Sequence, residues 1–328
     1  LQYLYTVDIE TTTNTQRTTL TIKMMGPGDD LPTLTRRNDH LGVLRYIRTH
    51  ELREPKLVVE HGFALLGKDG TRRLADEEVN VAVLEQMMLA SLDLGDFDTS
   101  EKLQTILASR VDPSSVRFRC LLVRSVEASG QFDKAASMYD EILQDNPANL
   151  VALQRKYCIA KASKQAPEKV VEALNEYLGQ NMADVSGWYE MAQLRMSLCD
   201  FKGAAYALEQ VILGSPLDSE MHCLLAEVYA TIGGLTNLIL ARKHMCQALE
   251  LNGSNVRAQF GLVSVANQYL EESAAAGKKE VDEHEVLVAK ELVKHGASEV
   301  LKSYKGNKTL FEAVKRVMDD FTDNLDEL

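Results

Sequence analysis

The chain has 328 residues, 45% of them hydrophobic and 26% charged, and 48 Asp and Glu against 36 Lys and Arg give a formal net charge of −12. This acidic balance argues against a nucleic-acid-binding protein, because phosphate neutralisation requires clustered Lys and Arg. No apolar run approaches the roughly 18 residues of a membrane-spanning helix, and no signal-peptide pattern opens the chain.

The first 37 residues differ in character from the rest. The stretch up to Lys23 is rich in Thr and has strand-like preferences, and the turn-rich segment 26–30 follows it. We expect residues 1–37 to be a disordered leader or an extension of the gene prediction, with the native start at Met24 or Met25. Nothing before about Asn38 is expected to carry function.

From Asn38 onward the apolar residues follow a helical period. Asn38 or Asp39 can cap a first helix, and Pro55 suits the first turn of a second. Gly67 and Gly70 then interrupt the chain. Two further helices are expected over 76–94 and 97–107, as a degenerate first repeat.

A recurring pattern organises the segment 116–217. Two stretches, beginning at Phe132 and Phe201, read aromatic, then Ala three residues later, then a large residue four later, and end at Pro147 and Pro216. This is the closing half of a tetratricopeptide repeat, a helix–turn–helix unit of about 34 residues. Trp188 supplies the opening aromatic residue of the second unit.

The spacing has a simple physical reason. Ala135 and Ala204 stand where two antiparallel helices cross most closely, and the larger Tyr139 and Leu208 fill the groove one turn later. The two full matches lie 69 residues apart, with a unit of about the right length between them. The pattern therefore predicts an all-α tetratricopeptide-repeat solenoid over residues 38–272.

Degenerate units follow the same plan. The unit after Pro147 closes with a helix over 167–178, and the unit after Pro216 carries three extra residues around 233–237. A helix over 255–271 begins another unit, and a polar loop is expected over 271–280. Residues 273–328 are expected to form C-terminal capping helices, over 281–304 and 309–321, with an acidic tail.

No catalytic constellation is found, so we expect a protein that is not an enzyme and that has no cofactor and no metal. The seven histidines lack metal-binding or catalytic spacing, and we interpret the cysteines as small buried hydrophobes. The last four residues, 325–328, have Leu where the KDEL retrieval signal has Lys, so we interpret the match as chance. The five cysteines are Cys120, Cys158, Cys199, Cys223 and Cys246.

Tetratricopeptide arrays bind partners mainly through the concave surface lined by their opening helices. Six residues are expected on this surface from their places in the repeat. A co-chaperone type of carboxylate clamp needs Lys and Asn on successive opening helices, but the matching places hold Gln154, Cys158 and Glu190. The six candidate partner-binding residues are Arg117, Arg124, Gln154, Tyr189, Gln193 and Glu227.

The stretch from Tyr139 to about Glu272 resembles one family, subunit 2 of the endoplasmic reticulum (ER) membrane protein complex. The three-residue expansion before Ala241 is the most specific mark, because a generic tetratricopeptide repeat lacks it. The resemblance is good over 38–268 and poor at both ends. Its segments are 139–147, 174–178, Trp188 with Glu190 and Ala192, 226–229, 233–238, 241–243, 247–249 and 257–262.

This resemblance implies a cytosolic scaffold without enzymatic activity, peripheral to the ER membrane. Its complex inserts transmembrane segments, including tail anchors. The expected partners are the membrane-embedded and cytosolic subunits of that complex, and neither nucleic acid nor a direct membrane span. Two alternatives remain: a generic tetratricopeptide adaptor for another assembly, which the 233–237 turn disfavours, and an enzyme with a fused helical domain, for which no segment outside the repeats is large enough.

Overall fold

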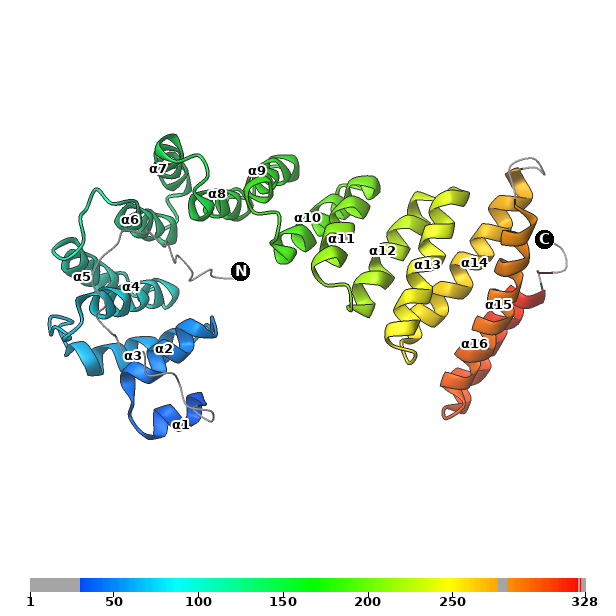
Figure 1. Cartoon of the computed structure of the whole chain (residues 1–328), viewed down its shortest axis with the longest axis horizontal. Coiled ribbons are helices and arrows are strands. Elements are labelled where there is room, and N and C mark those ends of the chain that lie inside the picture. The colour runs from blue at the N-terminus through cyan, green and yellow to red at the C-terminus, as the bar shows by residue number, and fades with distance from the viewer. Residues whose placement is uncertain (1–29, 277–281, 324, 326–328) are drawn as a thin grey trace, which may run out of the picture. The chain divides into compact units, whose positions relative to one another are not determined.

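The computed structural model describes residues 30–276, 282–323 and 325 (Figure 1). Within these ranges it contains sixteen α-helices and no β-strand. The predicted all-α fold is therefore confirmed. The chain divides into two compact units, Leu1–Ile159 and Ala160–Leu328, which are described here one at a time.

From α1 to α7, each helix of unit 1 contacts the next along the chain, and α4 also contacts α6. Its core gathers buried side chains of α1 to α6, and a second cluster joins α6, α7 and α8. The helices are α1 (Leu31–Arg36), α2 (His40–Thr49), α3 (Pro55–Leu66), α4 (Glu77–Asp93), α5 (Phe97–Ala108), α6 (Val116–Ala128), α7 (Phe132–Asp145) and α8 (Leu150–Ala162), whose last turn belongs to unit 2.

Short polar residues cap several helices of unit 1, and at α2 the cap is one of the two residues that the sequence predicts. The Asp39 side chain accepts a hydrogen bond from the Gly42 backbone N–H at 2.9 Å, which caps α2. Asp76 caps α4 in the same way through Glu78 at 3.0 Å. Helix α4 is buried on several sides because it packs against α3, α5 and α6.

Helix α1 lies inside the range expected to be leader. Its N-cap Asp30 accepts from the Thr33 backbone N–H at 3.1 Å, Pro32 lies in its first turn, and Leu34 is buried with the core of unit 1. At residues 31–36 the expectation of a disordered segment is therefore corrected. The Thr-rich stretch 1–23 and the rest of the expected linker up to residue 29 lie outside the described residues.

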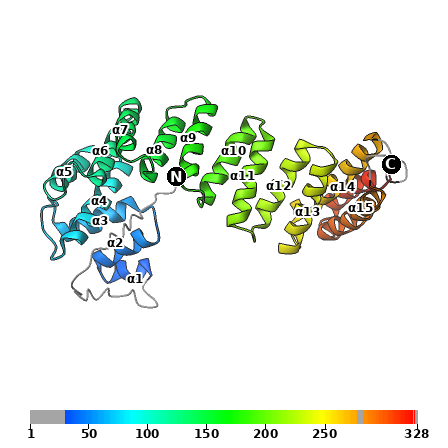
Figure 2. The ribbon, with the colours of Figure 1, turned by 45° about the horizontal axis from the view of Figure 1, so that its top comes forward.

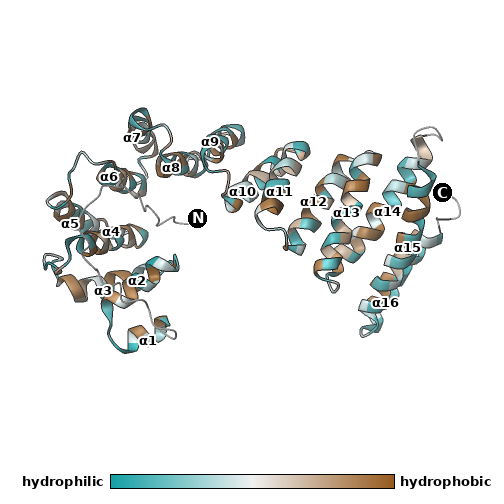
Figure 3. Cartoon of the chain, in the orientation of Figure 1, coloured by the Kyte–Doolittle hydropathy of each residue, from teal (hydrophilic) through white to brown (hydrophobic). Residues whose placement is uncertain are grey.

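Unit 2 continues the helical succession, and each of its helices packs against the next (Figures 1 and 2). Figure 3 shows hydrophobic and hydrophilic residues interspersed along these helices. The helices are α9 (Pro167–Gln180), α10 (Val185–Ser197), α11 (Phe201–Gly214), α12 (Ser219–Ile232), α13 (Leu235–Leu251), α14 (Val256–Ala276), α15 (Glu283–Tyr304) and α16 (Lys308–Asp323).

The repeat positions predicted from sequence form the contact between α10 and α11. Ala204 and Leu208 are fully buried, and Trp188 is 9% exposed. The Trp188 indole N–H donates to the Met182 carbonyl oxygen at 2.9 Å, and its ring meets Tyr206 edge-on with centroids 5.8 Å apart. The small alanine and the large aromatic residue therefore lie where the repeat pattern predicts them.

The turn between α12 and α13 is built on two glycines. Gly233 and Gly234 have φ of 72° and 86°. Residues with a Cβ atom rarely adopt such positive φ values, whereas glycine does so readily. The Asn237 side chain donates to the Gly233 carbonyl oxygen at 2.8 Å and closes the turn. The three extra residues noted in the sequence lengthen the start of α13 and not this turn. Helix α13 begins six residues before Ala241, whereas α11 begins three residues before Ala204.

The loop expected over 271–280 is wrong at its start, because α14 continues to Ala276 and passes the expected boundary at residue 272. Glu and Ala have high helix propensity, and they make up most of the segment 271–276. The Asn267 and Gln268 amides also donate one turn ahead, to Glu271 at 2.7 Å and Glu272 at 3.2 Å. Residues 277–281 lie outside the described part.

Candidate partner-binding surface

The six candidate residues all lie on opening helices. In unit 1, Arg117 and Arg124 are on α6 and Gln154 is on α8; in unit 2, Tyr189 and Gln193 are on α10 and Glu227 is on α12. Arg117 and Gln193 are exposed, and the other four are half-buried. The structure thus places each candidate on an accessible part of an opening helix, in two groups of three. Their role in binding remains a prediction.

In unit 1, ion pairs connect neighbouring opening helices. The Arg117 guanidinium on α6 donates to the Glu85 carboxylate on α4 at 2.7 Å. This hydrogen bond holds the pKa of Arg117 above its usual range. The Arg117 side chain is 59% exposed and the Glu85 side chain 15%, so water screens the guanidinium side of the pair.

A second pair, Arg155 of α8 with Glu127 of α6, is buried. The side chains are 14% and 11% exposed, and Arg155 Nε donates to Glu127 Oε2 at 3.0 Å while Nη2 donates to the other oxygen. Burial disfavours the Arg155 cation, but the hydrogen bonds and charge of Glu127 outweigh it and raise its pKa. This two-point pairing fixes α8 against α6, so it holds the opening helices of unit 1 in register.

In unit 2, one arginine joins two opening helices. Arg257 of α14 donates to Glu227 of α12 at 2.6 Å and to Glu220, two turns earlier on α12, at 3.1 Å. Asn255 donates to the other Glu220 oxygen at 2.8 Å. The hydrogen bond to Glu227 raises the pKa of Arg257, with that to Glu220 adding to it.

This cluster remains accessible to a partner. The side chains of Arg257, Glu220 and Glu227 are 45%, 54% and 41% exposed. At the start of unit 2, Lys161 and Glu190 form a further ion pair from α8 to α10. The opening-helix surface of unit 2 therefore presents preorganised carboxylates and a guanidinium, groups that can hydrogen-bond a polypeptide.

Sequence reasoning missed the residues that pair with the candidates, among them Glu85 and Arg257. A signal was present, since opposite charges recur about one repeat apart. Arg117 is 32 positions from Glu85, and Arg257 is 30 positions from Glu227. Residues one repeat apart occupy equivalent places on neighbouring opening helices, so such charges can meet.

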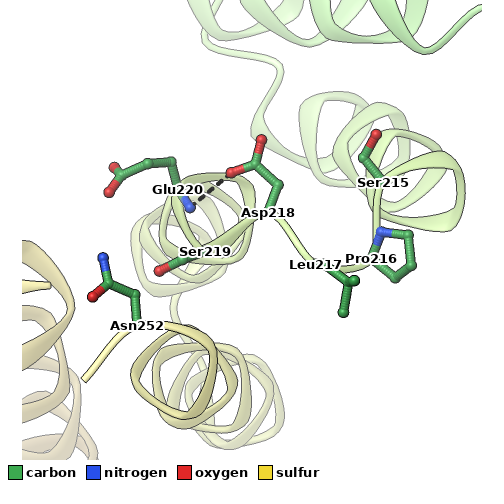
Figure 4. Close-up of a pocket in the computed structure, with 7 residues that line it drawn as sticks. All are labelled: Ser215, Pro216, Leu217, Asp218, Ser219, Glu220 and Asn252. Atoms are coloured by element: carbon green, nitrogen blue, oxygen red, sulfur yellow. Dashed lines mark hydrogen bonds between the residues drawn. The ribbon is translucent and has the colours of Figure 1, made fainter. Parts of the chain in front are cut away.

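A shallow depression of about 640 Å³ lies between the turn before α12 and the end of α13 (Figure 4). Its polar groups serve the fold. Asp218 accepts from the Glu220 backbone N–H at 3.0 Å and caps α12, and the Ser219 hydroxyl donates to the Ala248 carbonyl oxygen at 2.9 Å. Its wall residues are Ser215, Pro216, Leu217, Asp218, Ser219, Glu220 and Asn252.

A metal site and a membrane-spanning helix are two other features that the described residues could contain. Among the residues that the structure describes, no three His, Cys, Asp or Glu side chains come together in a way that could hold a metal ion. None of the helices in the described ranges combines the length and apolar character needed to cross a bilayer.

Comparison with known proteins gives consistent matches. A family model described as the EMC2 TPR-like repeat domain matches residues 104–239. ER membrane protein complex subunit 2 of Xenopus tropicalis is 39% identical over 215 residues, which cover 66% of this chain and 71% of that protein. Subunit 2-B of Xenopus laevis is 35% identical over 235 residues, covering 72% and 77%.

A more distant relative is the TPR repeat protein oca3 of Schizosaccharomyces pombe, 25% identical over 60% of this chain and 70% of that one. Among solved structures, the C-terminal part of a TPR repeat-containing protein from Cytophaga hutchinsonii covers 86% of this chain and 97% of its own, with a TM-score of 0.46 at 12% identity.

Proposed function

Because the chain belongs to the family of ER membrane protein complex subunit 2, we propose that it is a non-catalytic scaffold subunit of that complex, on the cytoplasmic face of the ER membrane. In this role it holds membrane-embedded and cytosolic subunits together. It thereby supports the insertion of transmembrane segments, including tail anchors, without contributing chemistry of its own.

The observation that carries the proposal is the arrangement of the opening helices. Arg257 of α14 holds Glu220 and Glu227 of α12, the adjacent opening helix, in place while all three side chains remain about half exposed. Preorganised polar groups cost little entropy when a partner binds, which favours a stable docking surface. A helical array also offers a long surface for several polypeptides at once.

Attachment to the membrane is expected to come through protein partners. The formal net charge of −12 disfavours attraction to anionic lipids, and even one lipid anchor gives only marginal binding. Interfaces of obligate complexes are large and apolar, so they resist salt better than attraction to lipid headgroups does. We therefore expect the chain to sediment with ER membranes in high salt and to leave them when the membrane subunits are depleted.

The test uses the chain at its endogenous level. Affinity purification followed by mass spectrometry should recover the other subunits of the complex, and Arg257→Glu should reduce that recovery because it places three carboxylates together. Lys202→Glu is the matched control, since it makes the same charge change at an exposed position of α11, a closing helix. Recovery of a different assembly would favour a generic adaptor instead.

Liposomes provide a second, independent test. The purified chain should not bind vesicles that contain anionic lipid. Direct binding to such vesicles, or unchanged ER association after loss of the membrane subunits, would contradict the scaffold role.

A further inference from the structure

Unit 2 contains a histidine where the preceding repeat has its signature tryptophan. Trp188 donates its indole N–H to the Met182 carbonyl oxygen, six residues earlier, at 2.9 Å. One repeat later, His222 makes the equivalent contact through Nε2 to the Pro216 carbonyl oxygen, also six residues earlier, at 3.1 Å. His222 therefore takes the place of the repeat tryptophan and keeps its hydrogen bond.

A second histidine fills the space that the smaller ring leaves. His244 lies three residues after the crossing alanine Ala241, and the equivalent place after Ala204 is the buried Ala207. One repeat thus packs a large ring over a small side chain, and the next packs two rings of intermediate size. The two histidines join α12 to α13, with Nδ1 of His222 and Nδ1 of His244 3.0 Å apart.

The protonation of this pair follows from its partners. A carbonyl oxygen only accepts, so His222 Nε2 carries a hydrogen, and the neutral His222 ring has a lone pair on Nδ1. The bond between the rings is therefore donated by His244 Nδ1–H to His222 Nδ1. Each ring has one defined tautomer.

The geometry is that of a shared hydrogen bond. The ring centroids are 5.3 Å apart, which is close to the 3.0 Å nitrogen separation plus the two ring radii, so both nitrogens lie near the line between the centroids. Among the described residues, no third His, Cys, Asp or Glu side chain joins the pair to form a group that could hold a metal ion.

The charged groups around the pair are few. Glu209 of α11 accepts from the Tyr229 hydroxyl of α12, and the Tyr229 ring stacks on His244 with centroids 6.0 Å apart. From α14, Arg257 is engaged with Glu220 and Glu227. On α13 itself, Arg242 pairs with Glu285 of α15.

Burial and the neighbouring ring both disfavour charge on His244. Burial is the larger cause of its lowered pKa, the charge of His222 adds to it, and the carboxylate of Glu209 acts in the opposite direction. His222 is only 6% exposed, so a charge on this ring would be poorly solvated.

We propose that the His222–His244 pair is a proton-sensitive clasp, which holds α12 against α13 while it carries at most one added proton and opens when both rings are protonated. A first proton on His244 Nε2 leaves the bond between the rings intact. A second must bind His222 Nδ1, the acceptor. Two N–H donors and two positive charges would then face each other, and the bond cannot persist.

The direction of the pH effect follows from proton counting. In the unfolded chain both rings bind protons near the ordinary histidine pKa of about 6.5, whereas the folded pair binds one at most. Below about pH 6.5 the unfolded state therefore holds more protons, and stability falls as the pH falls. At about pH 5.5, excluding one proton increases the unfolding equilibrium constant about tenfold.

The device goes beyond the proposed scaffold role because it makes one repeat responsive to acid. Helix α12 also carries Glu220 and Glu227, so opening the clasp would disturb that part of the opening-helix surface. Partners that contact α12 should then dissociate more readily at low pH.

The test copies the preceding repeat into this one. The double variant His222→Trp with His244→Ala restores the tryptophan and alanine combination and removes both titrating rings. Thermal and urea unfolding are measured at about pH 7.5 and about pH 5.5 for the full chain and the variant. We expect the wild type to show about a tenfold larger acid-dependent increase in the unfolding constant. Equal pH dependence in both proteins would overturn the proposal.

The pair His40–His61, with its Nδ1 atoms 2.8 Å apart in unit 1, is present in both proteins and so cancels in this comparison. If the variant does not fold, nitrogen NMR of the wild-type imidazoles decides the question. His222 should carry its hydrogen on Nε2 and His244 on Nδ1. Two independent titrations at ordinary histidine pKa, with the fold intact, would refute the clasp.

Discussion

Replacing Ala204 by Leu tests the repeat register at its tightest point. Ala204 of α11 is fully buried, and so are Ala192 of α10 and Leu208 one turn later. The added side chain therefore has no solvent-facing space to enter, and it must push α10 and α11 apart or force unfavourable rotamers.

Overpacking of a filled core costs about 1–3 kcal/mol. In a unit of this size each kcal/mol lowers the melting temperature by roughly 2–4 °C. The measurement is thermal unfolding of the full chain followed by circular dichroism. Lys202→Leu is the control, because it adds the same side chain at an exposed position of the same helix and should change stability little.

An unchanged melting temperature for Ala204→Leu would refute the reasoning. It would mean that the helices do not cross at Ala204, and the assignment of Trp188 as the opening aromatic residue of the same repeat would fall with it.

Three further perturbations probe other features. Arg155→Met should lower the free energy of unfolding, measured in urea, by about 3 kcal/mol, because it leaves the Glu127 carboxylate buried without its arginine partner. Adding Glu127→Leu should recover most of this loss. If stability does not recover, the unpaired carboxylate is not the cause of the loss. Gly233→Ala should lower the free energy of unfolding by about 1–2 kcal/mol, because φ is 72° at this position. Gly179→Ala is the control, since Gly179 lies within α9 with open space around it, and it should not destabilise the protein. Asp218→Ala should lower stability by about 1 kcal/mol by removing the cap of α12, whereas Asp218→Asn should have a smaller effect if capping is its role.

Much of the helical plan could be predicted because its signals are local. Proline at position 55, aspartate at 76 and the glycine pair at 233–234 act on their own turn of chain, and the structure begins or ends helices there. The end of α14 was missed because polar composition indicated a loop, although Glu and Ala also favour helix. Helix α1 was missed because its single buried residue, Leu34, gives too little pattern.

The surface was harder to predict than the fold. The repeat register identifies which positions lie on opening helices, so it located Glu227 and Arg117 on them. The register did not identify Arg257. The contact that positions this residue is with Glu227, which lies 30 positions earlier on another helix. To predict ion pairs between repeats, one must know the rise and rotation from one repeat to the next. No local sequence pattern encodes these two quantities.

The ion pairs between alternate helices also affect how the protein opens. In a stack where each element contacts only near neighbours, stability is a sum of intrinsic and boundary contributions, as in a one-dimensional chain of coupled states. Arg257 strengthens one such boundary, between α12 and α14, so these helices should exchange their amide hydrogens together. A ligand that bridges the same two helices would act on the coupling between repeats, and it would slow the exchange of both more than that of α16, whose only substantial packing within the described residues is against α15.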